Sequence, residues 1–200
     1  VIAKDYLYAD PTQLVTFADN HDVPRVAYFT RGNLKKTKLI YDILLTTRGI
    51  PQLFYGSEIG LVGTDDHGTL RIPFPGGFPN HSRDAFTENG REPNQNELFN
   101  HIKKLIGLRK KYLSLAEGKL IHYPPVNDVY VYFRTLGIEK CMIIVNNSKK
   151  NQDVNLLPMK KMISTDNKLL NLLNNMETKL DAKAAITIEA ESSSIYKILD

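Results

Sequence analysis

Residues 14–22 read LVTFADNHD, an apolar and β-branched run that stops at four polar residues. Such a run predicts a short buried strand that ends in a polar loop. Residues 34–48 then carry apolar side chains at helical spacing, and Gly49 ends the pattern. A second apolar run, residues 50–55, predicts another buried strand. The order strand, helix, strand predicts a right-handed crossover between parallel strands, and therefore an α/β sheet or barrel.

Residues 57–93 form a long stretch rich in Gly, Pro, Asp and Asn. A connection of this length without regular structure is typical of a functional loop, and its phenylalanines and arginines predict that it is ordered. Residues 96–112 have apolar positions on one stripe, which predicts an amphipathic helix.

From about Ser114 the pattern changes to short alternating runs separated by turn-forming residues. They predict an antiparallel β-sandwich over residues 113–200, distinct from a first domain over residues 1–112. The leucines of residues 164–175 fit either a short helix or a strand with a turn. The predicted strands are 119–123, 129–134, 141–146, 154–157, 185–189 and 195–199.

The composition excludes several classes of protein. Of 200 residues, 42% are hydrophobic and 24% are charged, and there is one cysteine, which excludes a disulfide scaffold and argues against disorder. No apolar run reaches the roughly 20 residues of a membrane span. The net charge of +4 is spread along the chain, which disfavours nucleic-acid binding. Cys141 lies in the apolar run CMIIVN and is expected to be a buried, inert thiol. A single cysteine is compatible with either the periplasm or the cytoplasm of a bacterium, so the compartment is left undetermined.

His21 and Asp22 follow the first predicted strand directly. Loops at the carboxyl ends of barrel strands are where α/β barrels place catalytic groups. Asp22 could act as an acid, base, nucleophile or charge stabiliser, and His21 could donate hydrogen bonds to a polar substrate. The alternative is that Asp22 only caps the next segment and that His21 is an ordinary loop residue.

FADNHDVPR, residues 17–25, resembles the last short sequence block of the α-amylase superfamily, glycoside hydrolase family 13, at the end of the seventh barrel strand. GIPQLFYGSEIGL, residues 49–61, resembles the eighth strand and its loop. HGTLRIPFPGGFP, DAFTENGR and QNELFNHIKKLIGLRKKY are similar to the neopullulanase and cyclomaltodextrinase branch. The resemblance implies the last strands and helices of a (β/α)8 TIM barrel, followed by a C-terminal antiparallel β-sandwich.

The resemblance also implies roles for the residues of the first loop. Asp22 would be the carboxylate that stabilises the oxocarbenium-like transition state, and His21 would hydrogen-bond the same sugar. Asn20 is a candidate substrate contact that more plausibly supports the loop. Arg25 is a candidate substrate-binding residue that would orient Asp22, or else a surface salt-bridge residue.

The second loop is less informative. Tyr55 is a candidate substrate contact, although a structural role is favoured for it and for Glu58. The family commonly has Asp where this chain has Ser57, so no role is carried over to that position. Phe74, Phe78 and Phe86 could stack on sugars, but packing of the loop is the favoured use.

The parent enzyme implied by the resemblance is a retaining hydrolase of α-glucan oligosaccharides: maltodextrins, cyclodextrins or pullulan. Its nucleophile and acid/base carboxylates lie in upstream strands, so the chain is expected to be a C-terminal part that is silent alone. Unpaired barrel strands are expected to associate with the missing N-terminal part of the barrel or with another copy. The alternatives are a carbohydrate-binding or structural module, and a transglycosylase of the same superfamily.

No cofactor or metal is required for this chemistry. Asp65, Asp66 and His67 offer ligands that could hold calcium, but the favoured interpretation is a solvated loop tip.

Overall fold

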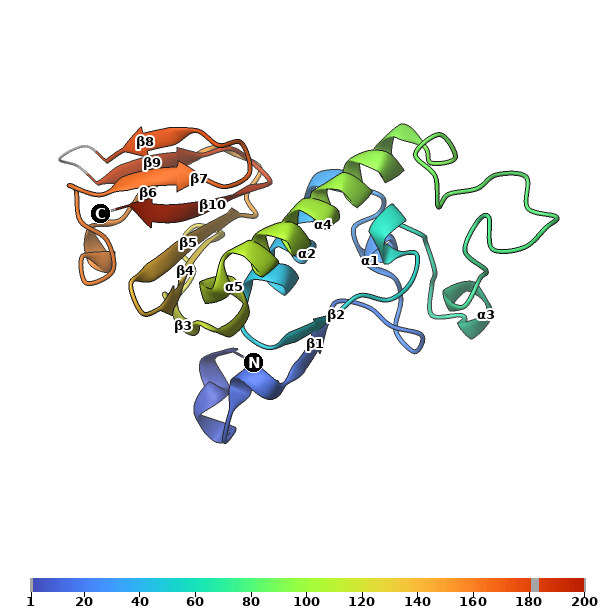
Figure 1. Ribbon diagram of the computed structural model, residues 1–200, viewed down its shortest axis with the longest axis horizontal. Coiled ribbons are helices and arrows are strands. Elements are labelled where there is room, and N and C mark those ends of the chain that lie inside the picture. The colour runs from blue at the N-terminus through green and yellow to red at the C-terminus, as the bar shows by residue number, and fades with distance from the viewer. Residues whose placement is uncertain (1, 181–183, 200) are drawn as a thin grey trace.

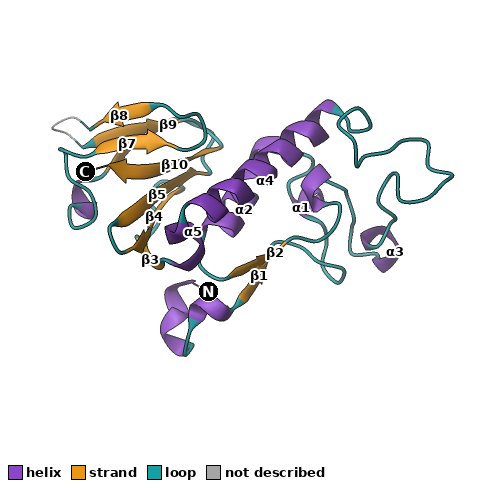
Figure 2. Cartoon of the chain, viewed as in Figure 1, coloured by secondary structure: helices purple, strands orange, loops and turns teal. Residues whose placement is uncertain are grey.

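A computed structural model describes residues 2–180 and 184–199. Figure 1 shows an elongated molecule with an antiparallel β-unit at one end, helices α2 and α4 in the middle and a long loop at the other end. Figure 2 shows that the strands gather mainly in the β-unit, while only β1 and β2 accompany the helices. Among the described helices, none is long and apolar enough to cross a membrane.

The predicted strand–helix–strand unit is confirmed. β1 (Val15–Phe17) and β2 (Ile50–Gln52) pair in parallel and are connected by α2 (Leu34–Thr46). Gly49 takes a φ of 102° before β2, where a Cβ would stand 2.6 Å from the carbonyl oxygen of Leu14. The crossover therefore requires glycine at this position.

The expectation that both strands are buried is wrong for one face. Val15 and Phe17 are about half exposed, and so is Ile50, which lies opposite Val15. The reason is that no described element covers this face of the two-stranded sheet. The uncovered apolar face predicted from the sequence is thus present.

Helix α4 (Pro93–Lys111) begins three residues earlier than predicted, because Pro93 fits the first turn and Glu92 forms a capping box with Gln95. It buries Leu98, Ile102 and Leu105, which confirms the amphipathic pattern. The long loop that precedes it is irregular as predicted, apart from two short helical turns. The other helices that precede the first strand of the β-unit are η1 (Ile2–Leu7), η2 (Pro11–Gln13), α1 (Val26–Phe29), η3 (Ser57–Ile59), α3 (His67–Leu70) and α5 (Leu113–Glu117).

The β-unit contains two antiparallel sheets that share one hydrophobic core. The larger sheet has the order β3-β4-β5-β10-β7-β8, and β6 pairs with β9. For segment 164–175 the sequence left a helix and a strand as alternatives. The segment contains a strand, in which Leu169 is fully buried and pairs with Ile198. The strands are β3 (Lys119–His122), β4 (Val129–Leu136), β5 (Glu139–Asn146), β6 (Gln152–Asn155), β7 (Lys168–Asn171), β8 (Glu177–Lys179), β9 (Ala185–Ile188) and β10 (Ser192–Leu199); η4 (Leu157–Met159) follows β6.

The central strands of the larger sheet are buried on both faces. Val131 and Phe133 of β4 face the core shared with β6 and β9, while Tyr132 belongs to the cluster formed with α2 and α4. The hydroxyl of Tyr132 lies 2.6 Å from that of Thr46, at the end of α2. The β-unit is therefore packed directly against the helices.

Two arginines, Arg134 buried and Arg109 partly buried, reinforce this junction. Arg134 of β4 donates to the carbonyl oxygens of Thr46 and Gly118 at 2.7 and 2.9 Å. Arg109 of α4 donates to Leu45, Thr47, Gly49, Leu115 and Ala116. Both guanidinium groups thus satisfy carbonyls where α2 and α5 end, as cations at helix C-termini do.

Candidate active site at the ends of the parallel strands

In the loop after β1, two side chains accept hydrogen bonds from backbone N–H groups. Asp19 is buried, and its carboxylate accepts from the N–H of Val26 at 3.0 Å, at the start of α1. The amide oxygen of Asn20 accepts from the N–H groups of Asp22 and Val23 at 2.7 and 3.1 Å. Asn20 therefore holds the turn, as the sequence favoured, and the turn presents Asp22 to solvent.

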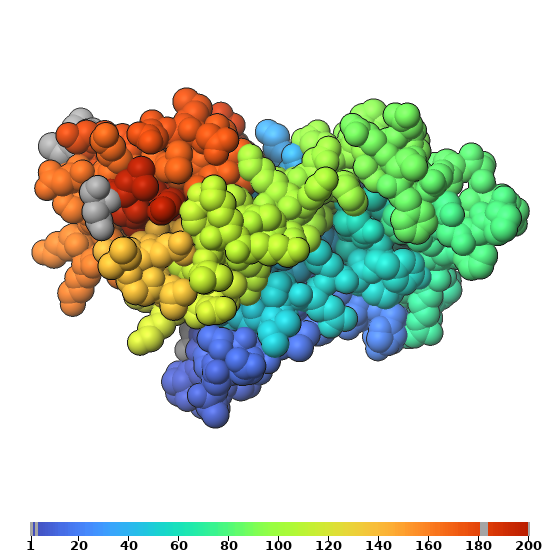
Figure 3. Space-filling view, viewed as in Figure 1, coloured from blue at the N-terminus to red at the C-terminus, as the bar shows by residue number. Residues whose placement is uncertain are grey.

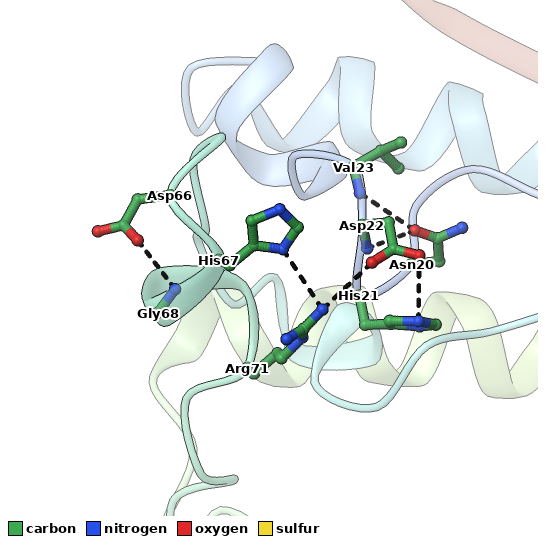
Figure 4. A network of polar contacts seen from close by, with 8 residues as sticks. All are labelled: Asn20, His21, Asp22, Val23, Asp66, His67, Gly68 and Arg71. Atoms are coloured by element: carbon green, nitrogen blue, oxygen red, sulfur yellow. Dashed lines mark hydrogen bonds and ion pairs between the residues drawn. The ribbon is translucent and has the colours of Figure 1, made fainter.

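Asp22 is at the centre of a polar network (Figure 4). His21 Nε2 lies 3.1 Å from Oδ2 of Asp22, and Arg71 Nη2 lies 3.2 Å from Oδ1. The side chains of His21 and Asp22 are 58% and 56% exposed, so both remain open to a ligand. Arg71 also contacts His67 Nδ1, at 3.3 Å. Arg71 could not be predicted from the sequence as a partner of Asp22, because 49 residues separate the two and no local pattern connects them.

The structure corrects the prediction for Arg25. This side chain is fully buried, and its guanidinium donates to the carbonyls of Tyr55 and Leu70 at 2.5 and 2.8 Å. It also lies 4.0 Å from the centre of the Phe54 ring. Arg25 thus neither orients Asp22 nor forms a surface salt bridge, because its donors face inward and connect the two loops beneath the site.

Ser57 has a defined structural position. Its hydroxyl lies 2.8 and 3.0 Å from the two carboxylate oxygens of Asp19, and Arg25 donates to it at 3.3 Å. The serine therefore connects a buried carboxylate to a buried cation. Burial raises the pKa of the neighbouring Tyr41 hydroxyl well above its usual value, and the negative charge of the nearby Asp19 raises it further.

Tyr55 is 40% exposed, and its hydroxyl donates to the carbonyl oxygen of Ile72 at 2.9 Å. This bond ties the long loop to the end of β2, so a structural contribution is present whether or not substrate contacts the ring. Glu58 lies with Tyr55 along a groove of about 530 Å³ between this segment and α4.

The aromatic residues of the long loop divide in two. Phe74 packs against the small cluster of Ile59, Leu61 and Ala85, as favoured from the sequence. Phe78 and Phe86 are 57% and 64% exposed. The packing role is thus confirmed for Phe74. The centre of the Phe86 ring also lies 4.4 Å from that of Phe74, and the centre of the Phe78 ring lies 5.5 Å from that of His81.

The acidic tip of the long loop is used for local capping. Asp66 Oδ1 accepts from the N–H of Gly68 at 2.9 Å, at the start of α3. In the part of the chain that the structure describes, no three His, Cys, Asp or Glu side chains are grouped to hold a metal ion.

Comparison with known protein families shows which family this chain belongs to. The family model described as the alpha-amylase catalytic domain matches residues 4–118, more than half of the chain. The chain belongs to the alpha-amylase family. A second model, described as the cyclo-malto-dextrinase C-terminal domain, matches residues 120–197 of this alpha-amylase family chain.

Individual relatives agree with the two models. A cyclomaltodextrinase of Geobacillus thermopakistaniensis is 32% identical over 154 residues, covering 74% of this chain and 24% of the relative. A maltogenic alpha-amylase of Bacillus acidopullulyticus is 28% identical over 201 residues, covering 98% of this chain and 31% of the relative. An Anoxybacillus alpha-amylase structure superposes with a TM-score of 0.80 at 26% identity, covering 98% of this chain and 40% of that one. This chain thus spans less than a third of the length of the cyclomaltodextrinase and of the maltogenic alpha-amylase.

Proposed function

We propose that this chain is the carboxyl-terminal part of a retaining α-glucan hydrolase and that Asp22 stabilises its transition state. The observation that carries the proposal is the half-exposed Asp22–His21 pair at the carboxyl end of β1, inside the segment that matches the alpha-amylase catalytic domain. Carboxyl ends of parallel strands are where barrel enzymes assemble their sites.

In this proposal Asp22 accepts hydrogen bonds from sugar hydroxyl groups at the cleavage subsite. Positive charge develops at the anomeric carbon as the glycosidic bond breaks, and a nearby carboxylate becomes more favourable as that charge grows. His21 Nε2 donates to Asp22, and the other ring nitrogen, Nδ1, is the one left to hydrogen-bond the same sugar. Asn20 contributes by holding the turn, and Tyr55 by fixing the wall formed by the long loop.

The two carboxylates of the covalent step are proposed to come from upstream sequence. Retaining glycosidases need a nucleophile and an acid/base residue about 5 Å apart. We therefore expect the 200-residue chain to be inactive alone and Asp22 to act only when the upstream strands are present.

The proposed architecture assigns residues 1–112 to the end of a (β/α)8 barrel and residues 113–200 to a sandwich that braces it. The parallel pair of β1 and β2 with its exposed apolar face supports the first assignment. The burial of Tyr132 and Ile143 against the helices supports a bracing rather than a glucan-binding sandwich.

The proposed substrates are maltodextrins, cyclodextrins or pullulan. Transglycosylation is the second candidate, because a cyclomaltodextrin glucanotransferase of Bacillus sp. (strain 1-1) is 28% identical over 93% of this chain. Both reactions use the same covalent intermediate, so product analysis separates them: new oligosaccharides indicate transfer, and reducing ends alone indicate hydrolysis.

The test measures reducing-sugar release from cyclomaltodextrin, pullulan and soluble starch. The 200-residue chain and its Asp22→Asn variant are expected to be silent, whereas the complete enzyme turns over and loses that turnover on Asp22→Asn. Full activity of the complete Asp22→Asn enzyme would refute the role of Asp22. Activity of the short chain would show that it holds its own nucleophile.

A further inference from the structure

Arg71 is the partner of Asp22 that comes from outside its own loop. The carboxylate has two side-chain partners among the described residues: His21 on Oδ2, and Arg71 on Oδ1 (Figure 4). The two contacts engage different oxygens. A carboxylate rotates readily about its terminal torsion, and partners on both oxygens define one orientation.

The backbone around Arg71 is fixed from below. Arg25 donates from its buried guanidinium to the carbonyl of Leu70, at 2.8 Å. Tyr55 donates to the carbonyl of Ile72, at 2.9 Å. The residues on both sides of Arg71 are thus hydrogen-bonded to the site, and Leu70 is fully buried. The position from which the Arg71 side chain extends toward Asp22 is therefore set by the fold.

His67 aligns the guanidinium of Arg71. His67 is the first residue of α3, and Arg71, four residues later, is the C-cap of this helix. Since a guanidinium has no acceptor, His67 Nδ1 accepts the hydrogen bond from Arg71 Nη2 and carries no proton in this contact. The same Nη2 has a second proton for Asp22. Figure 4 shows Arg71 lying between the histidine and the carboxylate.

We propose that Arg71 is a positioning residue that holds the carboxylate of Asp22 in its catalytic orientation. The proposal rests on the function proposed above for Asp22. Arg71 and Asp22 are 51% and 56% exposed, and an exposed ion pair contributes little to folding. In an active site, in contrast, misplacement of one group by about 1 Å costs about a hundredfold in rate. The effect of Arg71 therefore falls on turnover rather than on stability.

The experiment compares variants of the complete enzyme that carries this chain. Arg71→Met is expected to lower kcat by about tenfold or more, with a smaller change in KM. Arg71→Lys restores only part of that loss, since lysine keeps the charge without the planar fork. Arg83→Met is the matched control: Arg83 lies on the same loop, and its guanidinium contacts Gln95 and Glu92.

A double-mutant cycle separates positioning from a general structural effect. With α-maltosyl fluoride as substrate, Arg71→Met is expected to cost nothing further in an Asp22→Asn background, because its partner is already altered. Guanidinium ion at low concentration is expected to raise the rate of an Arg71→Ala enzyme and to leave Arg83→Ala unchanged. Melting temperatures of all the variants check that the fold is kept.

The outcomes keep the two proposals apart. If Asp22→Asn abolishes turnover while Arg71→Met stays within twofold of the Arg83→Met control, the positioning role is refuted and the role of Asp22 stands. Losses that multiply in the double variant refute it as well. If Asp22→Asn itself keeps full turnover, the proposed function fails, and the positioning role fails with it.

Discussion

Arg25 and Arg71 belong to the same site but have opposite surroundings. Arg25 is fully buried beneath the loops, whereas half of Arg71 is exposed beside Asp22. The sequence placed Arg25 near Asp22 because they are three residues apart, yet burial turned its donors inward. Position along the chain made Asp22 and His21 candidates, and the turn at Asn20 presents the two side chains together. It could not identify Arg71, whose approach depends on the path of a long loop.

Replacement of Arg25 is expected to destabilise the chain. Arg25→Met removes two hydrogen bonds to carbonyls and leaves buried Asp19 without the cation that Ser57 connects to it, which we expect to cost about 3 kcal/mol or more. Ser57→Ala, which removes only the bridging hydroxyl, is expected to cost about 1 kcal/mol. Urea unfolding followed by circular dichroism measures both. Equal midpoints for Arg25→Met and the unaltered chain would contradict the prediction.

Cys141 is expected to react with thiol reagents only after unfolding. The side chain is fully buried, and burial raises the pKa of the thiol to about 11. The native chain should therefore resist a chromogenic disulfide reagent at mildly alkaline pH and react fully in concentrated urea. Cys141→Ala, which has no thiol, is the control. Rapid labelling of the native chain would show that β5 opens readily.

The same pKa shift predicts a sign for the dependence of stability on pH. Since folding raises the pKa from 9.0 to about 11, the unfolded chain releases the proton first. The contribution of the protonated thiol is complete below pH 9.0 and is lost as the pH rises toward about 11. Urea midpoints across this range should fall less steeply in Cys141→Ala than in the unaltered chain. Parallel curves for the two would contradict the prediction.

At the scale of elements, local patterns were most reliable where both faces of an element are specified. The apolar stripe of α4 and the alternation in β4 predicted their type and, within a few residues, their extent. The sequence alone could not distinguish a helix from a strand in segment 164–175, because its leucines fit both periods. Pairing with β10 and β8 makes part of this segment a strand. Strand β2 ends at Gln52 rather than at residue 55, because its partner β1 ends at Phe17, the residue that pairs with Gln52. Long-range pairing, which no local window contains, set these differences.

Arg134 is expected to hold the β-unit to the ends of α2 and α5. Burial lowers the pKa of its guanidinium to about 10, so the group stays charged near neutral pH while donating to Thr46 and Gly118. Arg134→Met should lower the free energy of unfolding by about 3 kcal/mol, because charged hydrogen bonds to buried carbonyls are lost. Arg83→Met, at a more exposed position, is the control and should change it by less than about 0.5 kcal/mol. Similar urea midpoints for the two variants would refute this role.

At the scale of the whole molecule, the helices are packed tightly against the larger sheet, whereas β1 and β2 leave an apolar face exposed. The cluster that joins α2 and α4 to Tyr132, Ile143 and Ile195 makes the helices and the larger sheet one packed body. Val15, Phe17 and Ile50, in contrast, are exposed side by side on β1 and β2. In the space-filling view of Figure 3 the N-terminal residues project from the body beside this region. We expect an apolar sheet face of this kind to be covered by another polypeptide, upstream barrel strands in the proposed enzyme or a second copy of the isolated chain.

The isolated chain is therefore expected to self-associate through β1 and β2. Phe17→Lys places a charge in the middle of the exposed face and should weaken the association at least about thirtyfold, since burial of one aromatic side chain contributes about 2 kcal/mol. Ile138→Lys is the matched control, because Ile138 is 93% exposed at the turn between β4 and β5. Sedimentation velocity over a range of concentrations measures the effect. A chain that stays monomeric at every concentration would show that this face is stable in water, and would remove the main structural support for upstream barrel strands.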